Sequence, residues 1–234
     1  MILPGKKVRL RSVKIQDTKM LHRWINNKKL NRFLGAEIPI SLAKEKKIVR
    51  QMVKSKGSKH FIIELVETKE PIGMMSLHHI NKKHRRAFTG AYLAYAKHWG
   101  KGYGSDAKMV LLKYAFTKLK LNRVESHAFP HNPRSVRYSL KCGYKREGLL
   151  RQSMCKKGKF YDSIILGVLK QDWLKVAKRQ GYLWTIRTKG SISKISYETI
   201  ASTKIYPQIL LHLFSQGGGA GWFCQVLRNT KGKT

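Results

Sequence analysis

Three glycines at alternate positions form the segment of this sequence that is best suited to bind a ligand through its backbone. Gly100, Gly102 and Gly104 let the chain turn without Cβ clashes and approach a ligand closely. An apolar stretch at 91–94 predicts a strand before them, and an apolar-periodic stretch at 108–119 predicts a helix after them. Free amide groups and the positive end of a helix dipole therefore converge at the glycines. Such a place is suited to bind phosphate.

The glycine segment alone is compatible with two kinds of site. Residues 102–107, Gly-Tyr-Gly-Ser-Asp-Ala, fit the dinucleotide fingerprint Gly-x-Gly-x-x-Gly/Ala, and Glu125 follows at a suitable distance for a ribose contact. The same glycines also suit the pyrophosphate of an acyl coenzyme A. A second motif has to decide between them.

That second motif lies over residues 132–144 and reads Asn-Pro-Arg-Ser-Val-Arg-Tyr-Ser-Leu-Lys-Cys-Gly-Tyr. The two motifs together resemble the GNAT superfamily of N-acetyltransferases, whose signature is Gln/Arg-x-x-Gly-x-Gly/Ala followed by Asn-x-x-Ser/Ala and then Lys-x-Gly-Phe/Tyr. A dinucleotide-binding fold gives no reason for the second motif. The segment Trp-Gly-Lys-Gly-Tyr-Gly resembles the branch that includes the ribosomal-protein N-terminal acetyltransferases, and the match to the superfamily extends from about Val8 to Trp173.

The resemblance implies an α/β GNAT fold, with a mixed, mostly antiparallel sheet that is flanked by helices and splayed where acetyl-CoA enters. Sequence patterns predict strands at 8–13, 60–66, 72–79, 87–93, 123–128, 144–150 and 161–169, and helices at 16–25, 41–54, 133–141 and from Trp173. We assign residues 1–180 to the acetyltransferase domain. Residues 181–234 form a C-terminal extension of unknown role, whose composition is compatible with poor order.

The resemblance also implies which residues contact acetyl-CoA. The predicted set is Tyr92, Leu93, Trp99, Gly100, Lys101, Gly102, Tyr103, Gly104, Ser105, Asn132 and Ser135. Trp99 stands where the family has Gln or Arg, but it removes one side-chain donor from a cradle made largely of backbone amides, so we expect binding to survive. A backbone amide near Leu93 would polarise the thioester carbonyl.

Transfer of an acetyl group to an amine also needs a base for the amine and a proton for the departing thiolate. In the ribosomal-protein branch the proton comes from a Ser three residues after the Asn. Ser135 matches it, although its alternative role is hydrogen bonding at the helix start. The candidate base is His127, which either acts through one water or is buried and hydrogen-bonded in the sheet. Glu125 shares its strand face and could assist, whereas Phe88 replaces an acidic residue common in the family.

Many family members supply the proton from a Tyr seven residues after the Asn. That position is Ser139 here, with Tyr138 one place earlier. One step along a helix rotates the side chain by about 100°, so we do not expect Tyr138 simply to take over the role.

Charge and composition limit the partners. Lys and Arg number 49 against 12 acidic residues, a net charge of +37. This excess is typical of a surface that meets ribosomes, RNA or other polyanions, or of a lysine-rich solvated face. It disfavours a polyamine acceptor unless acidic side chains such as Glu37, Glu64 and Glu125 gather in the cleft. Widely spaced cysteines predict no metal site and a reducing cytoplasm, and no apolar run is long enough to predict a membrane partner.

These patterns predict an acetyl-CoA-dependent N-acetyltransferase that needs no metal. The leading acceptor is a protein N-terminus, for instance of a ribosomal protein. Two alternatives remain open. One is a small amine such as a polyamine or amino sugar. The other is a catalytically silent, basic RNA-binding protein on the same scaffold, which the departures at Trp99 and Phe88 keep open.

Overall fold

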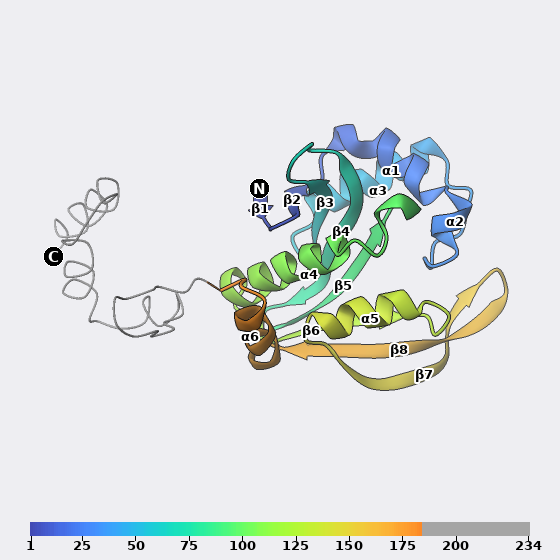
Figure 1. Ribbon diagram of the computed structural model, residues 1–234. Coiled ribbons are helices and arrows are strands. Elements are labelled where there is room, and N and C mark those ends of the chain that lie inside the picture. The colour runs from blue at the N-terminus through green and yellow to red at the C-terminus, as the bar shows by residue number, and fades with distance from the viewer. Residues whose placement is uncertain (184–234) are drawn as a thin grey trace, which may run out of the picture. The chain divides into compact units, whose positions relative to one another are not determined.

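A mixed eight-stranded sheet with helices on both faces forms the part of the chain that the structure describes (Figure 1). The structure is a computed structural model that describes residues 1–183. The strand order is β1-β2-β3-β4-β5-β6-β8-β7. The strands are β1 (Ile2–Pro4), β2 (Val8–Ser12), β3 (Lys59–Leu65), β4 (Pro71–Asn81), β5 (Arg86–Leu93), β6 (Arg123–Ala128), β7 (Lys145–Lys156) and β8 (Lys159–Leu169). Among the strands of residues 1–183, only β5 and β6 pair in parallel, so the sheet is mostly antiparallel, as predicted.

The helices are amphipathic or capped where the sequence indicates. They are α1 (Thr18–Ile25), α2 (Lys28–Asn31), α3 (Leu42–Lys54), α4 (Tyr103–Lys113), α5 (Pro133–Lys141) and α6 (Lys170–Arg179). Ser41 caps α3 by accepting a hydrogen bond from the Lys44 amide at 3.2 Å. Ile62 packs in one core cluster with Trp24 of α1 and Val49 of α3. Its neighbour Phe61 points to the other face, where its ring contacts Tyr114 just after α4.

Strands β5 and β6 pair over only part of their length. Their register ends at Thr89 and Ser126, after which Gly90–Leu93 pairs with β4 alone. Two side-chain hydroxyls close the paired region: Thr89 Oγ1 donates to the Glu125 carbonyl at 3.1 Å, and Ser126 Oγ donates to the Thr89 carbonyl at 3.5 Å. Beyond them the strands diverge, which confirms the expected splay.

Most predicted elements are confirmed, and the differences have local causes. The helix after the glycines begins at Tyr103, five residues before its apolar periodicity, and a π-helical turn at Tyr114–Lys118 follows it. Strand β7 extends to Lys156 because its mostly exposed residues pair with β8 without an alternating apolar pattern. The sequence analysis missed β1 and α2, which are too short to show a period. The predicted extension lies outside the described residues from position 184 onward.

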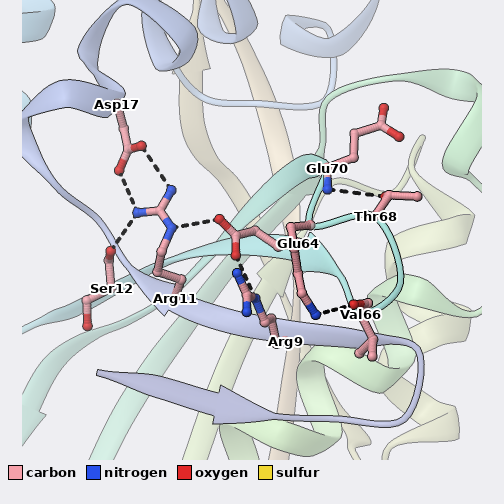
Figure 2. A network of polar contacts seen from close by, with 9 residues as sticks. Arg9, Arg11, Ser12, Asp17, Glu64, Val66, Thr68 and Glu70 are labelled. Carbon is pink, nitrogen blue, oxygen red and sulfur yellow. Dashed lines mark hydrogen bonds and ion pairs between the residues drawn. The ribbon is translucent and has the colours of Figure 1, made fainter.

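A polar network ties β2 to β3 and to the start of α1 (Figure 2). Glu64 accepts from Arg9 Nε at 2.8 Å and from Arg11 Nε at 2.7 Å. Two further bonds of 3.0 Å join the Arg11 guanidinium to the carboxylate of Asp17. The hydrogen bonds that Arg11 donates to Asp17 and, to a smaller extent, to Glu64 raise the pKa of Arg11. Glu64 is thus held by two arginines in the sheet and is not a free acid for chemistry.

A buried carboxylate in the first turn of α4 anchors both ends of the described chain. Asp106 accepts hydrogen bonds from the amides of Lys6, Lys7 and Val8 at 3.2, 2.5 and 2.9 Å. The Tyr182 hydroxyl also donates to it at 2.5 Å. Burial and this bond raise the pKa of Tyr182. The helix that follows the glycine turn is therefore fixed to the N-terminal loop and to the end of the described chain.

Candidate active site

A cavity of about 370 Å³ lies beside the splayed end of β5 and the glycine turn. Nine of the predicted cofactor residues line it: Tyr92, Leu93, Trp99, Gly100, Gly102, Gly104, Ser105, Asn132 and Ser135. Lys101 and Tyr103 belong to the same turn without lining the cavity. The Lys101 carbonyl accepts from Lys7 Nζ at 3.2 Å, and the Tyr103 ring contacts the buried ring of His98. The structure thus collects both sequence motifs around one space, and the individual contacts to a ligand stay predictions.

The glycine turn adopts the backbone that only glycine tolerates easily. Gly100 and Gly102 have φ values of +79° and +85°. Gly102 is the N-cap of α4, and its carbonyl accepts from the Asp106 amide at 3.0 Å. The amides of Tyr103, Gly104 and Ser105, which precede Asp106 in α4, have no partner within the helix. The turn therefore fits a phosphate group, as the sequence predicts.

Three basic side chains of α5 also line the cavity, and the sequence analysis did not single them out. Arg134, Arg137 and Lys141 follow one another at spacings of three and four, which place them on one helix face. The Arg134 guanidinium lies 4.3 Å from the centre of the Trp99 ring. The helical spacing of these three residues after Asn132 could have indicated that they face the same ligand as Asn132. Together with the glycine turn they give the cavity a positive wall for a polyphosphate.

Trp99 has a structural contact that explains how it can replace Gln or Arg. Its indole Nε1 donates to the carbonyl of Leu93, the last residue of β5, at 3.0 Å. Its ring also meets the Phe33 ring edge-on at a centroid distance of 6.2 Å. Trp99 thus joins the end of the splayed strand to the glycine turn and to the segment after α2.

Two residues of helix α5 that carry a hydroxyl group line the cavity. Ser135 and Tyr138, three residues apart, both line it. Ser139 is fully buried instead, where it donates to the Ser135 carbonyl at 2.9 Å and accepts from Lys108 Nζ at 3.0 Å. The helix rotation therefore turns the seventh residue after Asn132 into the core and Tyr138 toward the cavity. Sequence spacing alone did not indicate that Tyr138 accompanies Ser135.

Asn132 has a divided role at the start of α5. Its side-chain oxygen accepts from the Ser135 amide at 3.3 Å and caps the helix. This leaves the NH₂ group of Asn132 available to a ligand in the cavity, as expected for a contact to the pantetheine arm.

The two candidate bases lie outside the cavity lining. His127 is exposed and contacts the Phe88 ring at 5.7 Å, so the alternative of a buried histidine in the sheet is wrong. Glu125 is buried, with Oε1 3.2 Å from Arg123 Nε and 3.9 Å from Arg86 Nη1. Both roles as a base stay predictions, and the cavity gives them no support.

A second cavity, of about 930 Å³, lies between the segment around α2 and the β7–β8 hairpin. The His131 ring lines it and stacks on the Phe33 ring, which lines the first cavity, at a centroid distance of 6.4 Å. The two cavities therefore adjoin. The three glutamates whose gathering in the cleft would suit a polyamine do not gather there. Glu64 is held by Arg9 and Arg11, Glu125 lies beside Arg123, and Glu37 is exposed.

Among residues 1–183, no group of three or more His, Cys, Asp and Glu side chains is placed to hold a metal ion. Within the same range, no helix is long and apolar enough to cross a membrane.

The fold and the site define a transferase that uses an acyl coenzyme A. A sequence model of the acetyltransferase (GNAT) domain matches residues 7–145, and the chain belongs to this family. It is an N-acetyltransferase that depends on acetyl-CoA.

The names of similar proteins do not agree on one acceptor. The uncharacterized N-acetyltransferase YoaA of Bacillus subtilis is 31% identical over 72% of this chain and 97% of its own length. YdaF of the same organism, named provisionally as a ribosomal N-acetyltransferase, is 34% identical over 43% of this chain and 55% of its own length. A crystal structure of spermidine N-acetyltransferase from Vibrio cholerae with CoA and spermine superposes with a TM-score of 0.66 at 25% identity, covering 72% of this chain and 98% of the other.

Proposed function

We propose that this acetyltransferase modifies the α-amino group of a protein N-terminus in the cytoplasm, with ribosomal proteins as leading candidates. The observation that carries the proposal is the second cavity. Its volume of about 930 Å³ lies at the upper end of the range for small-molecule sites and suits the first residues of a peptide. Its His131 ring stacks on Phe33 of the cavity assigned to acetyl-CoA, and in this proposal the amine reaches the thioester beside these two rings.

The reaction is a direct transfer. The neutral amine attacks the thioester carbonyl, a C–N bond forms, the C–S bond breaks, and the thiolate takes up a proton while the amine loses one. In this proposal the glycine turn and the basic face of α5 hold the phosphates, and the NH₂ group of Asn132 contacts the pantetheine arm. An amide near Leu93 polarises the carbonyl.

Two hydroxyls of α5 are candidates to protonate the thiolate. Ser135 is the residue indicated by the resemblance, and Tyr138 shares its position on the cavity wall. A phenol, with an ordinary pKa of about 10, is closer in acidity to a thiol at about 8.5 than a serine hydroxyl is. The acidity of a phenol therefore favours Tyr138 as the proton donor, whereas the resemblance to the family favours Ser135.

A small amine is the second candidate, and one observation favours it: the similar structure from Vibrio cholerae is a spermidine N-acetyltransferase with bound spermine. A polyamine carries several positive charges and needs carboxylates around it. No carboxylate lines either cavity of the described chain. The charge of the site therefore favours the peptide. A silent protein that binds RNA through its basic surface is the third possibility, and it predicts no acetyl transfer at all.

Acetyl-CoA titration separates these possibilities at the first step. We expect stoichiometric binding to the wild type and none to Gly102→Glu, because a bulky anion at a φ of +85° blocks the turn by strain and by charge. Gly57→Glu, in open space away from the site, is the matched control. Peptide N-termini, spermidine and glucosamine are then assayed as acceptors. Binding of RNA without acetyl-CoA binding would contradict the proposal.

A further inference from the structure

The second cavity has a lining of one sign of charge. Five Lys or Arg side chains line it, Lys28 and Arg32 from the α2 segment and Lys156, Lys157 and Lys159 from the β7–β8 hairpin. No carboxylate lines it. Glu37 and Asp162 are next in sequence to lining residues, but Glu37 is exposed outside the cavity and Asp162 accepts from the Gln152 amide at 2.9 Å. The cations therefore lack a matching anion within the cavity.

One of the five cations, Lys156, has a structural role, and the other four can contact a ligand in the cavity. Lys156 Nζ donates to the carbonyls of Asn31 and Leu34 and so fastens the hairpin to the α2 segment. Burial and the neighbouring Lys157 lower the pKa of Lys156. Arg32 packs over the Phe33 ring at 4.6 Å, and no carboxylate of residues 1–183 forms an ion pair with it.

Lys28, Lys157 and Lys159 are exposed and reach the cavity from both of its walls. Charges on opposite walls suit a ligand with anionic groups on both sides, such as an extended chain, better than one with a single anionic group. Four like charges also repel one another until an anion lies between them.

We propose that the acceptor is an acidic peptide, whose N-terminal amine enters beside His131 and whose following Asp or Glu side chains lie among these four cations. The inference rests on the proposed function and names the class of its substrate. In this proposal, charge complementarity determines which N-terminus the enzyme prefers and increases the rate at which that peptide associates. The same charges repel spermidine.

The test compares three peptides that share an N-terminal serine and differ at the next three positions, which carry Glu, Gln or Lys. With the wild type at low salt, we expect kcat/KM for the Glu peptide to exceed that for the Gln peptide about ten-fold. The Lys peptide and spermidine should be poorer still. The preference should fall as salt is raised, because the cations are solvent-accessible.

Charge-reversal variants test whether the preference for the Glu peptide comes from the cations of the second cavity. Lys157→Glu with Lys159→Glu should lower the ratio of kcat/KM for the Glu peptide to kcat/KM for the Gln peptide from about ten to about one or less. Lys82→Glu with Lys83→Glu makes the same change of charge on the exposed β4–β5 turn, and it should retain most of the preference. Both double variants should bind acetyl-CoA as the wild type does.

The outcomes separate the two proposals. Equal rates for the three peptides would overturn the acidic acceptor while leaving N-terminal acetylation in place. Acetyl-CoA binding with no acetylation of any peptide would overturn the N-terminal acceptor itself. Faster acetylation of spermidine or of glucosamine 6-phosphate than of the Glu peptide would overturn the acidic peptide as substrate.

Discussion

At the scale of single residues, the proposed reaction leaves two hydroxyls of α5 as candidates to protonate the departing thiolate. Ser135 and Tyr138 share the cavity wall, whereas Ser139 is buried against Lys108. Tyr138 also has the Lys108 ammonium 4.3 Å from its ring centre, which fixes the ring in place by a cation–π contact.

We expect Tyr138→Phe to lower kcat about 100-fold with little change in the Kd of acetyl-CoA, because it removes a proton donor and keeps the ring. Ser135→Ala is the matched comparison on the same helix face and should cost less. Steady-state kinetics and acetyl-CoA titration of both variants check this. A larger loss of kcat in Ser135→Ala than in Tyr138→Phe would assign the proton to Ser135.

At the scale of elements, the position of the glycine turn depends on how α4 is anchored. Asp106 receives three backbone amides from the loop before β2, as well as the Tyr182 hydroxyl. Asp106→Ala leaves those buried donors without a partner. We expect it to lower the free energy of unfolding by about 3 kcal/mol.

The control for this prediction is Asp172→Ala. Its carboxylate pairs with the largely exposed Lys145 at 3.2 Å, and such pairs contribute at most about 1 kcal/mol. Urea unfolding followed by circular dichroism measures both variants. Equal losses would mean that the Asp106 contacts do not hold α4.

The elements were largely predictable from the sequence because each strand or helix near the site has its own local signal. Gly102 requires a positive φ, Asn132 caps a helix, and the strand at 87–93 is apolar. The catalytic candidates were less predictable. His127 shares a strand with Glu125, but only the three-dimensional register shows that both lie outside the cavity.

The charge of the acceptor side was not predictable either. Lys157 and Lys159 belong to a turn about 130 residues from Lys28 in sequence, and pairing of long strands brings them to one cavity. A composition of 49 basic residues does not say which of them share a wall.

At the scale of the whole molecule, we expect two neighbouring histidines to make the stability of the fold depend on pH. Burial and the nearby His78 lower the pKa of His60 to about 4. Burial also lowers the pKa of His78, and the two rings lie 5.4 Å apart. His60 Nδ1 has no hydrogen-bond partner in the structure.

A depressed histidine pKa means that the unfolded chain, at about 6.5, binds the proton first. Stability from these groups is complete above pH 6.5 and is lost as the pH falls toward 4. We expect the free energy of unfolding to decrease by about 1–2 kcal/mol between pH 7 and 5. His60→Phe should flatten this dependence in urea titrations across that range. An unchanged slope in the variant would assign the pH dependence to other groups.

The hydrogen bond between Tyr182 and Asp106 determines where the chain can be truncated without loss of the fold around the site. The predicted boundary at 180 cuts the chain two residues before the hydroxyl that reaches Asp106. Lys6 Nζ also donates to the Gln180 carbonyl at 2.6 Å and lies 5.0 Å from the Tyr182 ring centre. A catalytic fragment that ends at residue 180 would therefore lack the hydrogen bond from Tyr182 to Asp106, which helps to hold α4 and the glycine turn in place. Truncation trials should keep residues 181–183, and a loss of cofactor affinity in shorter fragments would reflect this missing contact rather than a role for the extension.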